Sequence, residues 1–150
     1  MDPFTQKDSR YLQGQMLLEE GSTMLAGLNI HHVVDGGVQF DIGFEESGST
    51  NRRVDATLQF LLDDGSVVAL RMVETALPLS NIVHGPFGHG IYTTHLATGV
   101  LPVADAKKLA AAKVITQLRH DLLSVGSVTR KLHAGASKQI IRAMVCATGA

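Results

Sequence analysis

Three histidines lie close together in the sequence and raise the question of a metal site. His84, His89 and His95 are joined by a glycine-rich segment, SNIVHGPFGHG, over residues 80–90. Imidazole nitrogens are common zinc ligands, but the spacing H-x4-H-x5-H matches no established metal motif, and no carboxylate lies in the segment to complete a site. We therefore expect an exposed loop and predict neither a metal nor another cofactor. A metal-dependent enzyme built on these histidines is kept as an alternative.

Residues for nucleophilic or acid–base catalysis are not arranged in a recognisable way. The single cysteine, Cys146, lies close to the C-terminus, which also excludes an intrachain disulfide, and no serine stands in a G-x-S-x-G context. The carboxylate pairs Glu45-Glu46 and Asp63-Asp64 fall at expected strand ends, where adjacent carboxylates are usually solvated. The glycine-rich stretches lack the strand-loop-helix context of a phosphate loop. The sequence therefore predicts a protein that is not an enzyme.

Polar side chains that are suited to RNA alternate with apolar ones in two segments. Residues 38–45 (VQFDIGFE) and 53–60 (RVDATLQF) place every second side chain on an apolar face. The opposite face carries groups that can meet a sugar-phosphate backbone, and a later strand over 91–101 adds a ring for base stacking and a hydroxyl. These residues are Gln39, Arg53, Thr57, Gln59, Tyr92 and Thr94. Any exposed sheet face is polar, so a merely solvated surface explains the pattern as well.

Strands are predicted wherever the hydrophobic period is two. Residues 11–34 read as two short strands, although QMLLEE within them can also form a helical turn. The turn signals DGG and DDG separate the strands that follow. The expected later strands cover residues 38–45, 53–60, 66–79 and 91–101.

From Pro102 onward the hydrophobic period changes to that of a helix. Apolar residues recur every three or four positions, which predicts one helix from a cap at Asp105 to Gly126 and another over 137–146, capped by Ser137. The apolar set of the first helix is Ala111, Ile115, Leu118, Leu122 and Val125. With strands over about 11–101 and helices over about 104–147, the chain is expected to form one α+β domain over 1–150. Its antiparallel sheet would have about five to seven strands, followed by two or more C-terminal helices.

Two further properties concern partners. Terminal amphipathic helices can cover a neighbour's sheet as readily as their own, which predicts an obligate homodimer. Residues 1–103 carry 5 Lys and Arg against 12 Asp and Glu, and residues 104–150 carry 8 against 2, a split of about −7 and +6. The basic half can bind a polyanion or lie on the acidic surface of another subunit. No secretory signal or membrane-spanning run is recognised, so a soluble intracellular protein is expected.

The stretch SGSTNRRVDATLQF, residues 47–60, resembles the central hairpin of the coat proteins of single-stranded RNA bacteriophages, the leviviruses. In that family an alternating strand, a serine-bearing turn, an Asn-Arg-Lys run and another alternating strand follow one another. Ser47, Asn51, Arg52 and Arg53 stand in those places here. The element order is similar too, because the family has a sheet of consecutive antiparallel strands, a mobile loop, one more long strand, and two helices that interlock with the partner's sheet.

The resemblance covers roughly residues 38–125 and implies a structural capsid subunit. Such a protein dimerises, assembles into an icosahedral shell in the host bacterial cytoplasm, packages single-stranded RNA in the virion, and can repress translation by binding an RNA hairpin. The expected RNA-binding residues are Asn51, Arg53, Thr57, Gln59, Tyr92 and Thr94. By the same resemblance Asp41, Glu45 and Asp55 face the RNA, where their carboxylates repel phosphate. An alternative is a small dimeric binding module such as a type III secretion chaperone, which requires helix at the N-terminus and between strands.

Overall fold

The computed structural model of the chain describes residues 10–16, 26–33, 36–49, 51–75, 77–86, 88–122, 126–132 and 134–149. The strands are β1 (Arg10–Met16), β2 (Ala26–Val33), β3 (Gly37–Ser47), β4 (Asp55–Leu62), β5 (Val67–Glu74), β6 (Leu79–Gly85), β7 (Gly88–Pro102), β8 (Ile115–His120) and β9 (Val128–Lys131). The helices are α1 (Val103–Ala111) and α2 (Ala134–Thr148). The turn expected between the first two strands lies outside the described residues.

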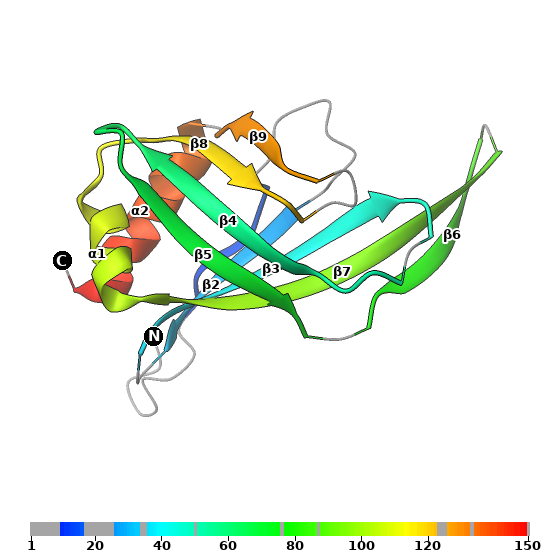
Figure 1. Cartoon of the computed structure of the whole chain (residues 1–150), viewed down its shortest axis with the longest axis horizontal. Coiled ribbons are helices and arrows are strands. Elements are labelled where there is room, and N and C mark those ends of the chain that lie inside the picture. The colour runs from blue at the N-terminus through cyan, green and yellow to red at the C-terminus, as the bar shows by residue number, and fades with distance from the viewer. Residues whose placement is uncertain are drawn as a thin grey trace.

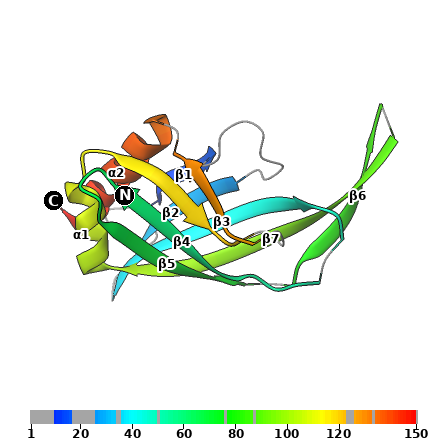
Figure 2. The ribbon, with the colours of Figure 1, turned by 45° about the horizontal axis from the view of Figure 1, so that its top comes forward.

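All strands belong to one curled antiparallel sheet with the order β1-β2-β3-β7-β5-β4-β8-β9, and β6 pairs with β7. Figures 1 and 2 show the two helices at one end of this sheet and the β6–β7 hairpin projecting from the other end. Seven strands precede the first helix, so the predicted α+β class with a C-terminal pair of helices is confirmed. The structure adds two strands, β8 and β9, between the helices.

The strand order differs from the consecutive order that the resemblance implied. β3 and β4, the expected central hairpin, are not neighbours, because β7 and β5 lie between them. Instead β3 pairs with β7 over its whole length, from Gly37 opposite Pro102 to Ser47 opposite Tyr92. Side-chain pairs between neighbouring strands stabilise a sheet, and the shorter β4 would offer β3 fewer of them. The prediction of a β3–β4 hairpin is therefore wrong.

The segment expected to be a loop, residues 80–90, forms most of the β6–β7 hairpin. Its ladder runs from Leu79 opposite Thr94 to Gly85 opposite Gly88. Gly88 has a φ of +124°, a backbone conformation that favours glycine, next to the tight connection. The prediction of a loop was wrong, because the Gly and Pro residues taken as loop signals gather at the tip.

The predicted helix over 105–126 is also wrong in its second half. Helix α1 ends at Ala111, and residues 115–120 form β8, which pairs with β4. Val114, Ile115 and Thr116 are three successive β-branched residues, which favour strand over helix. Pairing along the edge of β4 then satisfies the backbone of this segment.

Neither predicted helix cap has that role. Helix α1 has Pro102 as its N-cap residue without a side-chain cap bond, and Asp105 lies in its first turn. Ser137 lies inside α2 and is buried. Its hydroxyl accepts a hydrogen bond from the Ile115 amide at 2.9 Å. The serine thus joins α2 to β8 instead of starting the helix.

The hydrophobic core lies on the inner face of the sheet. Alternate residues of β3, β4, β5 and β8 point into one buried cluster, which α1 and α2 complete. Within it the rings of Phe40 and Phe60 lie 6.3 Å apart. Helix α1 packs on α2, β3, β5 and β7, and α2 also packs on β1, β2 and β8. Among the described residues, neither helix is long and apolar enough to cross a membrane.

These helix contacts bear on the predicted dimer. The expectation of interlocked subunits was based on an inner face that only a partner's helices would cover. In this chain its own helices lie against that face. A homodimer therefore stays a prediction that needs another physical basis.

Candidate nucleic-acid interface

The outer face of the sheet carries most of the candidate RNA-binding side chains. Along β4, buried residues alternate with exposed or half-buried ones, which leaves Thr57 and Gln59 on the outside. Arg53 is exposed in the 51–54 segment before β4. The period-two geometry of a strand therefore places these polar groups opposite the core.

Strands β8 and β9 extend this outer face beyond β4. Ladder pairing sets Arg119 opposite Gln59 and Gln117 opposite Leu61. On the far side of β8, Thr129 stands opposite Arg119, and Lys131 stands opposite Gln117. Because residues opposite each other in an antiparallel pair point to the same face, two cations and two amides gather on one surface.

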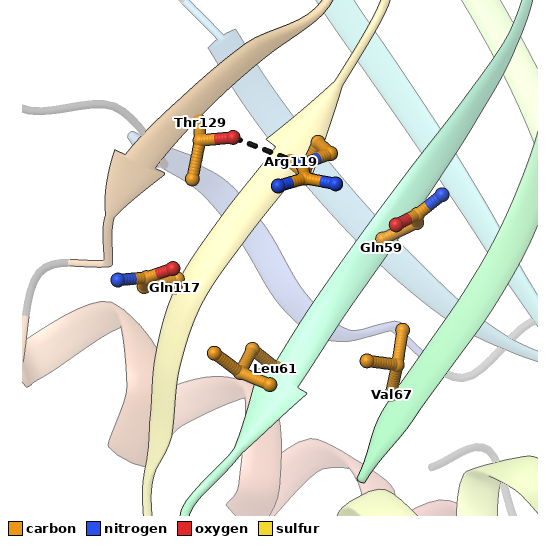
Figure 3. Close-up of a pocket in the computed structure, with 6 residues that line it drawn as sticks. All are labelled: Gln59, Leu61, Val67, Gln117, Arg119 and Thr129. Atoms are coloured by element: carbon orange, nitrogen blue, oxygen red, sulfur yellow. Dashed lines mark hydrogen bonds between the residues drawn. The ribbon is translucent and has the colours of Figure 1, made fainter. Parts of the chain in front are cut away.

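A hollow of about 110 Å³ lies in this surface and is open to solvent. Figure 3 shows its lining from four strands: Gln59 and Leu61 of β4, Val67 of β5, Gln117 and Arg119 of β8, and Thr129 of β9. Arg119 Nε donates to Thr129 Oγ1 at 3.0 Å, which holds the guanidinium over the strands. Apolar side chains beside amides and a guanidinium suit both stacking and hydrogen bonding of a nucleotide.

Asp55, which was expected to repel phosphate, is paired with a cation. Arg71 donates to both carboxylate oxygens, from Nε at 2.9 Å and from Nη2 at 2.8 Å. The hydrogen bond from Arg71 is the main reason why the pKa of Asp55 lies below its ordinary value, and the same bond raises the pKa of Arg71. The two charges compensate each other on the outer face, so the repulsion of a polyanion is reduced.

Asp41, the second carboxylate that was expected to face RNA, is hydrogen-bonded to neighbouring side chains on the sheet. Thr98 Oγ1 donates to its Oδ1 at 2.7 Å, and Gln39 Nε2 donates to the same oxygen at 3.0 Å. Gln39 thus binds a carboxylate of its own strand. Glu45, on the same strand, is exposed.

The structure places the six predicted residues on two separate parts of the molecule. Asn51, Arg53, Thr57 and Gln59 lie in or just before β4, whereas Tyr92 and Thr94 are half-buried on β7, where Thr94 lies between Glu45 of β3 and Leu79 of β6. Strand β5 separates β7 from β4. The surface around β4, β8 and β9 is therefore the more concentrated candidate site.

Sequence reasoning did not place the residues of β8 and β9 on this surface, although Lys131 belongs to the basic half that was expected to bind a polyanion or an acidic subunit surface. Gln117, Arg119, Thr129 and Lys131 fell in a predicted helix or beyond it. The β-branched run that ends at Thr116 was the signal that could have identified β8. The pairing of β8 with β4 is long-range and left no trace in local sequence.

The three histidines of the metal hypothesis are not brought together. His84 stands opposite His89 in the β6–β7 ladder, whereas His95 lies further along β7 and is fully buried. Among the described residues, no group of three or more His, Cys, Asp or Glu could hold a metal ion. The geometry gives no support to a metal-dependent enzyme.

A fourth histidine, His120, is buried at the inner side of β8. Its side chain is 1% exposed, and within the described part of the chain Nε2 has no hydrogen-bond partner. Nδ1 accepts a hydrogen bond from the Leu122 amide at 3.4 Å. Burial lowers the pKa of His120, and the nearby Arg130 also lowers it, against the opposing effect of Asp121. The ring is therefore held in its neutral form.

Comparison with protein-family models, with curated proteins and with solved structures found no match for this chain.

Proposed function

We propose that this chain is a structural subunit of the levivirus coat kind, which self-associates into a dimer and a shell and packages single-stranded RNA. The observation that carries the proposal is the outer surface formed by β4, β8 and β9. There Arg119 and Lys131 supply positive charge, and Gln59 and Gln117 supply amides over the hollow. No catalytic step is part of this function.

The two faces of the sheet are suited to different roles. The inner face is filled by the apolar cluster and the helices, and in the described part of the chain the solvent-accessible polar groups of β4 and β8 lie on the outer face. Lys and Arg side chains bind phosphate, while amides and apolar surfaces contact unpaired bases without requiring one sequence. The surface is therefore suited to packaging RNA with low sequence specificity.

Self-association is supported by apolar side chains on the outer face. Val73 of β5 is 46% exposed, and Leu96 and Val100 of β7 are 54% and 50% exposed. Val73 stands opposite Thr98, which lies between the other two along β7, so the three side chains are close neighbours. An apolar group of this kind on a sheet surface is suited to contact with a second copy.

The chaperone alternative has less support. It requires helix at the N-terminus and between strands, and the regular elements described up to Pro102 are all strands. Both described helices come after that residue.

Binding of single-stranded RNA tests the role of the outer surface. Arg119→Glu should weaken the binding of a fluorescent oligonucleotide and reduce the slope of log affinity against log salt by about 0.7, the contribution of one phosphate contact. Arg142→Glu is the matched control, because it changes the same charge at an exposed position of α2, which packs on the inner side. Equal losses in the two variants would refute the proposed surface.

Shell formation is tested by negative-stain microscopy of the purified protein mixed with RNA. Closed particles that protect the RNA from nuclease are expected. A uniform small species that never forms particles would contradict the coat function, even if RNA binding persists.

A further inference from the structure

The outer-face side chains around the hollow form two rows across four neighbouring strands. From β5 through β4 and β8 to β9, the first row is Val67, Leu61, Gln117 and Lys131, and the second row is Ala69, Gln59, Arg119 and Thr129. In both rows the residue on β5 is apolar, and the residues on β8 and β9 are polar or charged. The surface therefore has an apolar half and a polar half, which meet at β4.

Three side chains make up the apolar half, which we call the apolar shelf: Val67, Ala69 and Leu61. Val67 is 54% exposed, Ala69 is exposed and Leu61 is half-buried. Val67 and Leu61 stand opposite each other, so their Cβ atoms lie about 4.5–5.5 Å apart, and both line the hollow (Figure 3). A base that lies flat on this shelf removes apolar surface from water, whichever of the four bases it is.

The polar half holds two cations at a separation that suits one nucleic-acid strand. Arg119 and Lys131 are diagonal neighbours on β8 and β9, and the Cβ atoms of such residues lie about 7–8 Å apart. The bond from Arg119 Nε to Thr129 Oγ1 orients the guanidinium and leaves its two Nη groups for other partners. The two cations can therefore contact different phosphates of the same strand.

The carboxylates around the two rows favour one orientation of a nucleotide. Asp63 and Asp64 are exposed in the turn between β4 and β5, beyond the apolar shelf, where they repel a phosphate but not an uncharged base. At the other end, Asp121 follows β8 and accepts a hydrogen bond from the Thr57 amide at 2.7 Å, which turns its carboxylate toward β4. Phosphate is therefore favoured over β8 and β9, and the base over β5.

We propose that the hollow holds one nucleotide of single-stranded RNA in a fixed orientation, with its base on the apolar shelf and its flanking phosphates on Arg119 and Lys131. The RNA backbone then follows β8 and β9, and the base turns toward β5. Gln59 and Gln117 lie between the two halves, and because an amide both donates and accepts, each can contact the edge of any base. This inference rests on the proposed function, in which the outer surface binds RNA.

Two strands of equal length and charge separate the base from the phosphates: a short oligoadenylate and a ribose-phosphate strand without bases. Val67→Ala trims the shelf at an exposed position, so the fold should be kept. It should weaken the binding of the oligoadenylate by about three- to tenfold and leave that of the abasic strand unchanged. Leu61→Ala trims the same shelf from β4 and should give the same pattern. Fluorescence anisotropy of labelled strands measures each affinity.

Two further variants complete the design. Lys131→Gln should weaken the binding of both strands equally and reduce the slope of log affinity against log salt by about 0.7 for each. Val103→Ala is the matched control for Val67→Ala, because it trims a valine that is 44% exposed at the start of α1. It should leave the affinity for both strands unchanged.

The outcomes distinguish this inference from the proposed function. Equal losses for the two strands in Val67→Ala, or an unchanged affinity for oligoadenylate in both shelf variants, would overturn the orientation, whereas binding of RNA by the surface would stand. If the natural protein binds neither strand, the proposed function and this inference fail together. Binding that depends on the base in a protein that forms no particles would refute the coat function alone.

Discussion

Replacement of His120 by leucine is the most direct test of the inner side of β8. The side chain is buried, its Nε2 has no partner among the described residues, and its Nδ1 accepts one long bond from Leu122. A buried donor without a partner costs about 1–3 kcal/mol, and a typical hydrogen bond contributes about 0.5–1.5 kcal/mol. Leucine removes the unpaired donor and loses only the long bond. His120→Leu should therefore raise the free energy of unfolding at neutral pH by about 1 kcal/mol.

The pH dependence provides a second and independent reading of the same residue. The pKa of His120 in the folded chain lies below its ordinary value of 6.5, so the unfolded chain takes up a proton first as pH falls. The stability contributed by the neutral ring is complete above pH 6.5 and declines below it, by at most about 1.4 kcal/mol per pH unit for one proton. The leucine variant lacks this decline, and its advantage over the natural protein should grow in acid.

Urea unfolding at several pH values measures both effects. Circular dichroism reports the unfolding, because the chain has no tryptophan. Gln117→Leu is the control on the outer side of the same strand and should change stability by less than about 0.5 kcal/mol. A loss of about 2 kcal/mol or more in His120→Leu would mean that the ring makes strong polar contacts. If the decline of stability in acid were the same in both proteins, His120 would have to lie in solvent and not in the core.

Four other substitutions test the sheet and its outer face. Leu118→Asp puts a charge at a buried position of β8 and should lower the free energy of unfolding by about 3–5 kcal/mol. The chain should then unfold and show no cooperative thermal transition. Loss of a dimer with folded subunits would contradict the place of Leu118 in the core. Gly99→Ala should lower the melting temperature clearly, because a Cβ there would lie 2.3 Å from the Arg71 carbonyl oxygen. Gly43→Ala should have a mild effect, because the nearest atom to its Cβ, at 3.3 Å, belongs to the flexible side chain of Leu96. Asp55→Asn frees the charge of Arg71 and should strengthen RNA binding with little change in melting temperature, and weaker binding would refute the charge compensation.

The alternation of residues within strands was readable from the sequence because it is a local property. Ala56, Leu58 and Phe60 were predicted to point inward and are buried, and Thr57 and Gln59 were predicted to point outward and are half-buried. Each of these assignments needs only the period of two and the identity of the next residue. The α+β class followed in the same way.

The neighbours of each strand could not be predicted from the sequence, because the strands that pair are far apart along the chain. β3 finds its partner in β7, some fifty residues away, and the intervening strands carry the same alternating pattern. The spacing of Ile115, Leu118 and Leu122 fits a helix, and a strand buries both Ile115 and Leu118 here because the β4–β8 register shifts between them. The candidate surface around Arg119 depends on which strands are neighbours and on whether residues 115–120 form a strand. For that reason only its β4 portion was predicted.

The insertion of β7 between β3 and β5 sets the order in which the sheet can be completed. During synthesis β3 can pair with β2, and β4 with β5, as soon as each emerges, but the two pairs have no backbone connection to one another until residues 88–102 are available. Until then β3 exposes a full row of unpaired amides and carbonyls, which invites association with other nascent chains. Release of truncated chains that end before β7 should therefore yield aggregates. When many ribosomes translate one message, the arrival of β7 would be the step that limits the yield of folded chains.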